Sequence, residues 1–334
     1  MKLDGSITDV PGIKVGHADN PHALTGCTVI LCEEGAVAGV DQHGGAPGTR
    51  ETDLLRPMHL VEKAHAVLLS GGSAFGLDAA GGVMRYLEEN GIGVDTGVVR
   101  VPIVPAAILF DLDLGESAVR PDSEMGYQAC LNASMLPVRQ GNAGAGMGAR
   151  VGTMLGIEWA VKSGIGCASI DLGEGVVLGA IFAVNAFGDV IDPETNQILA
   201  GARLKNEKTA GMKQTDYFAN TLEIMRSQAG KENFKYFSSK NTVIGVLATN
   251  AELNVEQVNK LAQTAQDGLA RVIRPAHTMF DGDTIFALSI GNIQLDANIV
   301  QAFAAEVAAS AILNAVLHAE PAGGLPAASK FLDV

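Results

Sequence analysis

The residue with the most distinctive chemical surroundings in this sequence is Thr242. It follows a polar stretch, residues 203–240, that holds eight of the chain's 23 basic residues, and it opens the apolar run 243–248. A threonine hydroxyl is a weak nucleophile unless a base lies beside it, and a chain break before Thr242 would free its own α-amine, with a reference pKa of ~7.7–8.0. The layout therefore permits an N-terminal nucleophile, although a threonine at a strand start is more often a plain β-former.

A second candidate group combines one histidine with two aspartates. His277, Asp281 and Asp283 have a His-x-x-x-Asp-x-Asp spacing that could hold a metal ion. No second cluster of histidines or carboxylates accompanies this spacing in the sequence, so we expect neither a metal nor another cofactor. On local grounds, Asp281-Gly282-Asp283 is typical of a hairpin turn leading into a strand at residues 285–290.

A glycine-rich segment, residues 144–149, fits the G-x-G-x-x-A spacing of dinucleotide-binding loops. That fingerprint needs a buried strand directly before it, and residues 136–142 make a poor central strand. A close-packed loop is therefore the favoured interpretation. The N–H groups of Gly144 and Gly146 could still face a substrate or an oxyanion.

Ser73 is a further candidate because it follows an apolar run and precedes a helical pattern. It does not fit the G-x-S-x-G nucleophile elbow, since the second glycine comes one residue too late, at Gly76. We expect Ser73 to cap a helix over residues 75–90, with a substrate contact as the alternative.

The elements that must position these residues follow from hydrophobic periodicity. Apolar runs predict buried strands, and three- or four-residue spacing predicts helices. We expect strands at residues 28–31, 36–40, 66–69, 175–185, 242–249 and 285–290, and helices at 75–90, 254–270 and 299–318. The pair Gly81-Gly82 lowers helix propensity, which makes sense only if another backbone packs closely there. The pattern predicts a mixed α/β layer protein with much antiparallel pairing.

Composition and charge restrict the partners and the cellular compartment that we expect for this protein. The 334 residues carry a formal net charge of −14, which repels nucleic acid and anionic lipid. The apolar stretches 98–110 and 176–184 are too broken or too short to span a bilayer, and the first residues lack a signal-peptide pattern. We therefore expect a cytoplasmic protein without nucleic-acid or membrane partners, whose four cysteines are buried small hydrophobes.

Several segments together resemble one known family. They are residues 7–17, 70–77, 141–152, 183–185, 241–242 with the following strand, and 277–284. In this order they are similar to the DmpA-type aminopeptidases, the L-aminopeptidase/D-Ala-esterase family that also includes β-aminopeptidases and nylon-oligomer hydrolases. They extend over nearly the full length of the chain, so the resemblance concerns a single domain, residues 1–334.

The resemblance implies an αββα four-layer sandwich like that of N-terminal-nucleophile hydrolases. It also implies self-cleavage between Asn241 and Thr242 into residues 1–241 and 242–334, with Thr242 as the nucleophile. By position, Asn185 would stabilise the oxyanion, and Asp281 and Asp283 would orient the nucleophile and its amine. Two aspartates at these positions, together with a threonine nucleophile, are similar to the nylon-hydrolase branch.

The resemblance further implies hydrolysis of small peptides, amides or esters through an acyl-enzyme, and a homo-oligomer, a tetramer by analogy. Two positions depart from the family pattern: Thr153 stands where a lysine often follows the glycine run, and Phe110 stands where the nylon-hydrolase branch has tyrosine. Arg150 or Lys162 could supply the missing charge. An acyltransferase of the ornithine acetyltransferase type and a non-catalytic binding homologue are the alternatives.

Overall fold

Nine strands form the central sheet of this protein. A computed structural model describes residues 3–204, 217–228, 231 and 241–332. The strands of the sheet are β1 (Lys14–Asn20), β2 (Thr25–Gln42), β3 (Thr49–Arg50), β4 (Lys63–Ser70), β7 (Ala106–Ile108), β10 (Ile165–Gly173), β11 (Val176–Asn185), β14 (Thr242–Ala251) and β16 (Thr284–Ile293). Their order is β10-β11-β14-β16-β2-β4-β7-β3, with β1 also paired to β2.

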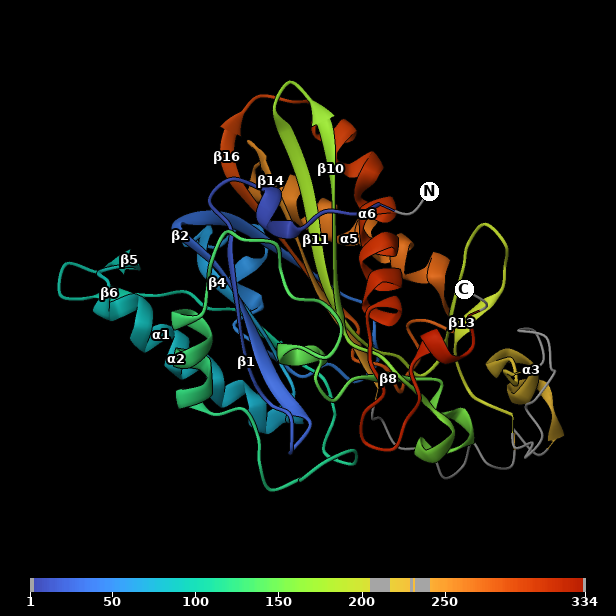
Figure 1. Cartoon of the computed structure of the whole chain (residues 1–334). Coiled ribbons are helices and arrows are strands. Elements are labelled where there is room, and N and C mark those ends of the chain that lie inside the picture. The colour runs from blue at the N-terminus through green and yellow to red at the C-terminus, as the bar shows by residue number, and fades with distance from the viewer. Residues whose placement is uncertain (1–2, 205–216, 229–230, 232–240, 333–334) are drawn as a thin grey trace.

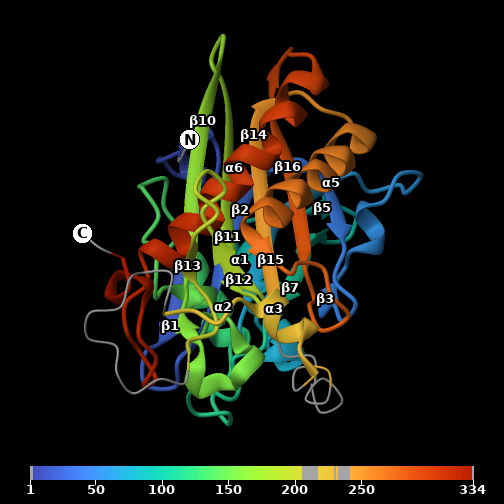
Figure 2. The same ribbon diagram turned by 90° about the vertical axis from the view of Figure 1, so that its right-hand side faces the viewer.

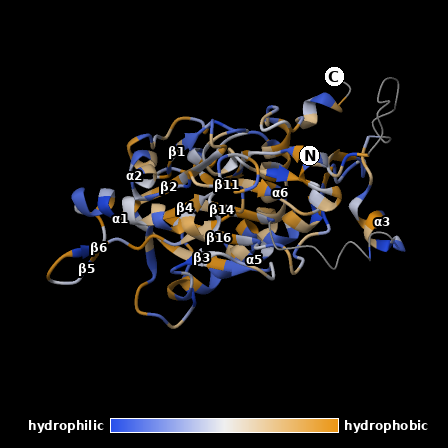
Figure 3. Cartoon of the chain, turned by 90° about the horizontal axis from the view of Figure 1, so that it is seen from below, coloured by the Kyte–Doolittle hydropathy of each residue, from blue (hydrophilic) through white to orange (hydrophobic). Residues whose placement is uncertain are grey.

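Helices cover both sides of these strands, and the short strands of the described residues form one three-stranded and two two-stranded sheets. The helices are α1 (Ala79–Glu89), α2 (Ser123–Leu131), α3 (Thr221–Arg226), α5 (Val255–Val272) and α6 (Ala297–Leu317). The short strands are β5 (Val94–Asp95), β6 (Arg100–Val101), β8 (Arg150–Val151), β9 (Val161–Lys162), β12 (Asp189–Ile191), β13 (Ile198–Ala200) and β15 (Ile273–Arg274). The β5–β6 pair and α3 lie at opposite ends of the molecule (Figure 3).

The long strand β2 joins two halves of the sheet. Its residues 27–31 pair antiparallel with β4, and its residues 37–42 pair antiparallel with β16. A register shift between Leu31 and Ala36 separates the two stretches, and such irregularities bend a strand. The predicted strands at 28–31 and 36–40 are therefore one continuous strand that belongs to both halves.

Three separate apolar cores show that the two halves stack as layers. Along β11, Phe182 faces the core beneath α5 and α6, whereas its neighbour Ile181 faces a second core shared with β2 and β4. Along β4, Val67 faces this second core and Leu68 faces a third core beneath α1 and α2. Alternating residues of a strand point to opposite faces. The order is therefore helix, sheet, sheet, helix, with α1 and α2 on one side and α5 and α6 on the other (Figures 1 and 2), and the predicted αββα sandwich is confirmed.

The pair Gly81-Gly82 lies in helix α1, which packs against α2. A Cβ added to Gly82 would lie 1.7 Å from the Ser123 carbonyl oxygen of α2, and one added to Gly126 of α2 would lie 1.9 Å from the Ala79 carbonyl oxygen. A Cβ on Gly81 would meet nothing closer than 3.7 Å. The expected close backbone approach is confirmed for Gly82 and not for Gly81.

Two sequence-based expectations about elements were wrong. Ser73 does not cap an α-helix: it has a φ of 54°, opens a 3-10 helix that ends at Asp78, and α1 begins only at Ala79. Asp281-Gly282-Asp283 is no hairpin turn, because β15 pairs with β12 while β16 runs parallel to β14. The predicted helix at residues 299–318 is α6, which by length and composition alone could also cross a membrane.

The position of α6 explains its apolar composition. Of its most apolar stretch, 72% is buried inside the protein, where the helix packs on α5, β10 and β11. It is thus a core helix of the sandwich. Most of the polar stretch at residues 203–240 lies outside the described residues. The described part of this stretch includes α3.

Candidate active site

Thr242 begins β14 at an edge where two parallel strands start side by side. It pairs with Asn185 on β11, while on the other side Ile244 is level with Thr284, the first residue of β16. Because β14 and β16 run parallel, the residues before both strands meet at this edge, and Asn241 forms a bridge with Asp281. The topology therefore brings Thr242 and the two aspartates together, although about 40 residues separate them along the chain.

The peptide bond between Asn241 and Thr242 is held from both sides. The Thr242 hydroxyl donates to the Asn241 carbonyl oxygen at 2.5 Å, and the Gly282 N–H donates to the same oxygen at 3.0 Å. The Thr153 hydroxyl donates to the Asn241 side-chain oxygen at 3.0 Å. A fixed backbone N–H on a carbonyl oxygen stabilises the negative charge that would develop there during attack.

Gly282 is a site residue that sequence reasoning did not single out. A Cβ at this position would lie 2.9 Å from Thr242 Oγ1 and 2.7 Å from the Ala46 carbonyl oxygen. Only a glycine lets the hydroxyl lie against the backbone between the two aspartates. Its place in the middle of an Asp-Gly-Asp segment suggested turn chemistry instead.

Asp283 accepts hydrogen bonds on both oxygens. Its Oδ1 accepts from the Val243 N–H at 2.9 Å, next to Thr242, and its Oδ2 accepts from the backbone N–H of His277 at 3.1 Å. The His277 ring contacts the same Oδ2 through Nδ1 at 3.0 Å. Although burial acts to lower the pKa of His277, its contact with Asp283 raises that pKa above the usual value.

Asp281 has a different environment two residues away. Its Oδ2 accepts from the Thr278 N–H at 3.0 Å and from the Thr278 hydroxyl at 2.6 Å. Burial, together with the negative charge of Asp283, raises the pKa of Asp281 to about 7. Asp281 is therefore largely protonated below neutral pH.

Asn185 lies beside Thr242 in the sheet, and its side chain is fixed by two residues. Its Nδ2 donates to the Phe110 carbonyl oxygen at 3.1 Å, and its Oδ1 accepts from the Arg150 N–H at 3.2 Å. The buried guanidinium of Arg150 also donates to the Phe110 carbonyl oxygen at 3.2 Å and forms a 2.5 Å ion pair with Asp113. The predicted oxyanion residue is thus adjacent to Thr242 by register, with a cation against its amide oxygen.

Lys162 is the other residue considered as a source of positive charge. It pairs with Arg150 across β8 and β9, and its Nζ donates to the carbonyl oxygens of Gly146 and Ser163 at 3.1 and 2.5 Å. Burial, with a further contribution from Arg150, lowers the pKa of Lys162 to about 7. Arg150, not Lys162, therefore supplies the cation that contacts Asn185.

Two of the remaining predicted substrate contacts, the N–H groups of Gly144 and Gly146, are occupied within the protein. The Gly144 N–H donates to Asp19 at 2.9 Å and the Gly146 N–H donates to the Ala143 carbonyl oxygen at 2.8 Å, so these donors are not presented to a substrate. The close-packed glycine loop is the interpretation that the structure supports. The Ser73 N–H donates to the Leu109 carbonyl oxygen at 3.0 Å and so ties its loop to the segment that includes Phe110.

No cluster of three histidine, cysteine or carboxylate side chains that could hold a metal occurs among the described residues. His277, Asp281 and Asp283 come together, but the carboxylates accept hydrogen bonds from protein donors instead. These three residues therefore lie together at the end of the sheet where Thr242 begins β14, and they form hydrogen bonds there.

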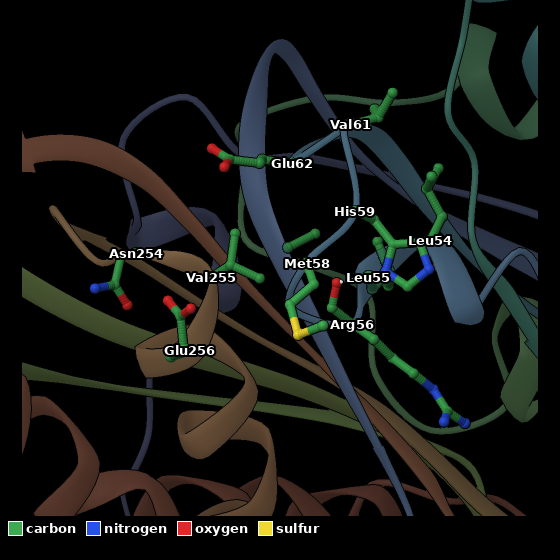
Figure 4. Close-up of a pocket in the computed structure, with 11 residues that line it drawn as sticks. Leu54, Leu55, Arg56, Met58, His59, Val61, Glu62, Asn254, Val255 and Glu256 are labelled. Carbon is green, nitrogen blue, oxygen red and sulfur yellow. Dashed lines mark hydrogen bonds between the residues drawn. The ribbon is translucent and has the colours of Figure 1, made fainter.

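One hollow lies near this edge, and a second lies beyond the opposite end of β14. The first, of about 240 Å³, borders the segment between β2 and β3 and is lined by Val40, Asp41, Gln42, Pro47, Thr49, Thr52 and Arg56. That segment contacts the site directly, because the Ala46 N–H donates to the Asp281 carbonyl oxygen at 2.9 Å. The other hollow, of about 110 Å³, lies between residues 54–62 and the start of α5 (Figure 4), and Thr242 and the two aspartates do not line it.

Comparison with known proteins gives matches over almost the whole chain. Residues 5–328 match peptidase family S58. An uncharacterised aminopeptidase of Mycobacterium tuberculosis is 43% identical over an alignment of 346 positions that covers 96% of each chain. A 6-aminohexanoate-oligomer endohydrolase of Kocuria sp. is 31% identical over 325 residues, which cover 92% of this chain and 84% of that protein.

Solved structures with the same fold are more distant in sequence. The L-aminopeptidase D-Ala-esterase/amidase of Ochrobactrum anthropi, described as a variant of the Ntn-hydrolase fold, gives a TM-score of 0.69 at 20% identity, covering 98% of this chain and 90% of that one. A β-aminopeptidase of Burkholderia sp. gives a TM-score of 0.68 at 22% identity, covering 100% and 94%. The resemblance stated from the motifs is confirmed by these matches.

Proposed function

This chain belongs to peptidase family S58, and we propose that it is an amidohydrolase that cuts itself before Thr242 and then uses Thr242 as an N-terminal nucleophile. The observation that carries the proposal is the geometry of one peptide bond. The Thr242 hydroxyl and the Gly282 N–H both contact the Asn241 carbonyl oxygen, at 2.5 and 3.0 Å. A nucleophile and an oxyanion donor thus meet at the bond that would break.

Self-cleavage would proceed in two balanced steps. Thr242 Oγ attacks the Asn241 carbonyl carbon, the C–N bond breaks, and the hydroxyl proton ends on the nitrogen that becomes the Thr242 amine. Water then hydrolyses the resulting ester, which leaves a carboxylate on Asn241 and restores the hydroxyl. The Gly282 N–H supports the oxyanion, and Thr153 holds the side chain of Asn241 in place.

In the mature enzyme the new amine would serve as the base. It takes the proton of the Thr242 hydroxyl as Oγ attacks a substrate carbonyl, and the departing amine of the substrate takes that proton. The acyl group stays on Thr242 until water releases it. Asp283, whose Oδ1 lies at the adjacent Val243 N–H, stabilises the charged amine, and Asn185 with Arg150 behind it supplies a polar group beside the nucleophile.

The substrates that we propose are small amides with a free amine, such as short peptides. The relatives support this class, since one is named an aminopeptidase and another a 6-aminohexanoate-oligomer endohydrolase. Both kinds of substrate present an amide bond whose carbonyl could be attacked by a threonine hydroxyl. The two aspartates of this chain favour the second kind, by the resemblance of the site to the nylon-hydrolase branch.

Intact-mass measurement on the purified protein tests the proposal directly. We expect fragments of about 25 kDa and about 10 kDa from the wild type, in proportion to residues 1–241 and 242–334 of a 34.5 kDa chain. Thr242→Ala should stay whole, and Thr242→Ser, which keeps a hydroxyl, should still cut. Thr249→Ala, on the same strand, is the matched control and should cut like the wild type. A wild type that remains at full mass after long incubation contradicts the proposal.

A further inference from the structure

We propose that His277 is a positioning residue for the chemistry at Thr242, acting through Asp283; this inference rests on the proposed function. His277 contacts Asp283 twice and Asp283 contacts the residue that follows the nucleophile. The histidine thus fixes the orientation of the carboxylate that lies nearest the start of β14.

The geometry of the two contacts gives the carboxylate a single orientation. Both the backbone N–H and Nδ1 of His277 lie within 3.1 Å of Oδ2 of Asp283. A carboxylate only accepts hydrogen bonds, so Nδ1 carries a proton in this arrangement. With Oδ2 held by two donors, Oδ1 is directed to the Val243 N–H at 2.9 Å.

The backbone of His277 is in a conformation that non-glycine residues adopt uncommonly. Its φ is 57°, in the left-handed region. The residue nevertheless keeps this conformation, in which its N–H and its ring meet the same carboxylate oxygen. Strain retained at a residue that contacts a site carboxylate is the pattern expected of a functional constraint.

A second histidine, His43, lies against the ring of His277. The His43 ring lies 5.1 Å from the His277 ring, centre to centre, and its Nδ1 is 2.8 Å from Asp41 Oδ2. The backbone N–H groups of His43 and Gly44 also donate to the carbonyl oxygen of Asp283, at 3.1 and 3.3 Å. The side chain and the main chain of Asp283 are therefore both held by neighbours outside its own strand.

Loss of the His277 ring should slow the reaction without weakening substrate binding. An unsupported carboxylate can rotate away from the start of β14, and a small misplacement of a reacting group can cost up to about 100-fold in rate. Because His277 does not need to touch the substrate to act in this way, kcat should fall while KM stays close to that of the wild type.

Two substitutions separate positioning from a merely structural role. His277→Gly removes the ring but accepts a φ of 57° without strain. His277→Asn keeps a donor at the place of Nδ1 and tolerates the left-handed backbone. His59→Gly is the matched control. His59 is exposed, and within the described part of the chain its ring hydrogen-bonds only to the Arg56 carbonyl oxygen.

The readouts are the rate of self-cleavage and, in cleaved protein, kcat and KM on a small aminoacyl amide, each with and without added imidazole. We expect His277→Gly to lose roughly tenfold or more in rate, imidazole to restore part of that loss, and His277→Asn to stay within about threefold of the wild type. His59→Gly should behave as the wild type and should not respond to imidazole.

The outcomes distinguish the inference from the function on which it rests. A His277→Gly variant that cuts and turns over at the wild-type rate overturns the inference alone. So does a loss that imidazole fails to reverse when His277→Asn is equally slow, because the residue is then structural. A wild type that never cuts contradicts the proposed function first, and the inference falls with it.

Discussion

At the scale of single residues, Asp281 and Asp283 differ in their properties because different groups donate hydrogen bonds to them. Asp283 receives the N–H groups of Val243 and His277 and a ring nitrogen, whereas Asp281 receives the N–H and the hydroxyl of Thr278. Hydrogen bonds to the charged form favour ionisation, and a neighbouring like charge disfavours it. Asp281, which is buried beside Asp283, is thus the group that titrates near neutrality.

This difference makes stability depend on pH in a way that Asp281→Asn should remove. The pKa of Asp281 is raised to about 7 by burial and by Asp283, so between about pH 4 and 7 the folded protein binds a proton that the unfolded chain does not. The free energy of unfolding should therefore fall as pH rises through this window, by about 2–4 kcal/mol.

Denaturant titrations at pH 5 and pH 8, in a Thr242→Ala background that keeps the chain whole, measure this effect. Relative to the parent, Asp281→Asn should be similar in stability at pH 5 and more stable at pH 8. An equal difference at both pH values would show that Asp281 does not titrate in this window.

Sequence reasoning identified part of this residue-level arrangement. Thr242, Asp281 and Asp283 were chosen by type and family resemblance, and the structure places them at one edge of the sheet. His277 was considered only as a metal ligand, and Gly282 only as a turn residue. Their roles depend on the parallel pairing of two strands that are distant in the chain, which no local pattern encodes.

At the scale of elements, the α1–α2 contact shows how closely two helices can approach through glycine. Replacing Gly82 with alanine would place a methyl group 1.7 Å from the Ser123 carbonyl oxygen, whereas the same change at Gly81 meets only the Ser123 hydroxyl at 3.7 Å. We expect Gly82→Ala to destabilise the protein by about 1–3 kcal/mol or more, and Gly81→Ala to stabilise it by about 0.5–1 kcal/mol.

Thermal or denaturant unfolding of the two variants beside the wild type checks this pair. The substitutions add the same atoms to the same helix, so the difference between them isolates the helix–helix contact. If both variants shifted stability in the same direction, the close approach of α1 and α2 would not be the cause.

The positions of helices and strands were predicted better than the pairing of the strands. The helices at residues 254–270 and 299–318 are α5 and α6 within a few residues, and the strand at 242–249 is β14. The partner of β16 was predicted wrongly because Asp-Gly-Asp is a common hairpin signal. Its actual neighbours, β14 and β2, are set by burial on both faces of the sheet, a property of the whole fold.

At the scale of the whole molecule, we expect the native protein to be a homo-oligomer, a tetramer by analogy with the family. Several large apolar side chains are strongly exposed in the single chain; they are Met58, Leu60, Leu131, Met135 and Leu136. Exposed apolar side chains of this kind are typical of surfaces that meet another protein chain. Light scattering on the eluting protein should give about 140 kDa, four times the mass of one chain. A mass near that of one chain would contradict the prediction.

The central sheet would also decide what becomes of the two pieces that the proposed cut before Thr242 produces. Strands β14 and β16 belong to the C-terminal piece, yet they lie between β11 and β2 of the N-terminal piece. The pieces are interleaved, so dilution alone should not part them. After unfolding, however, two separate chains must find each other again, and recovery becomes dependent on concentration. A single cut would thus turn a reversible folding reaction into one that dilute, mature protein cannot repeat.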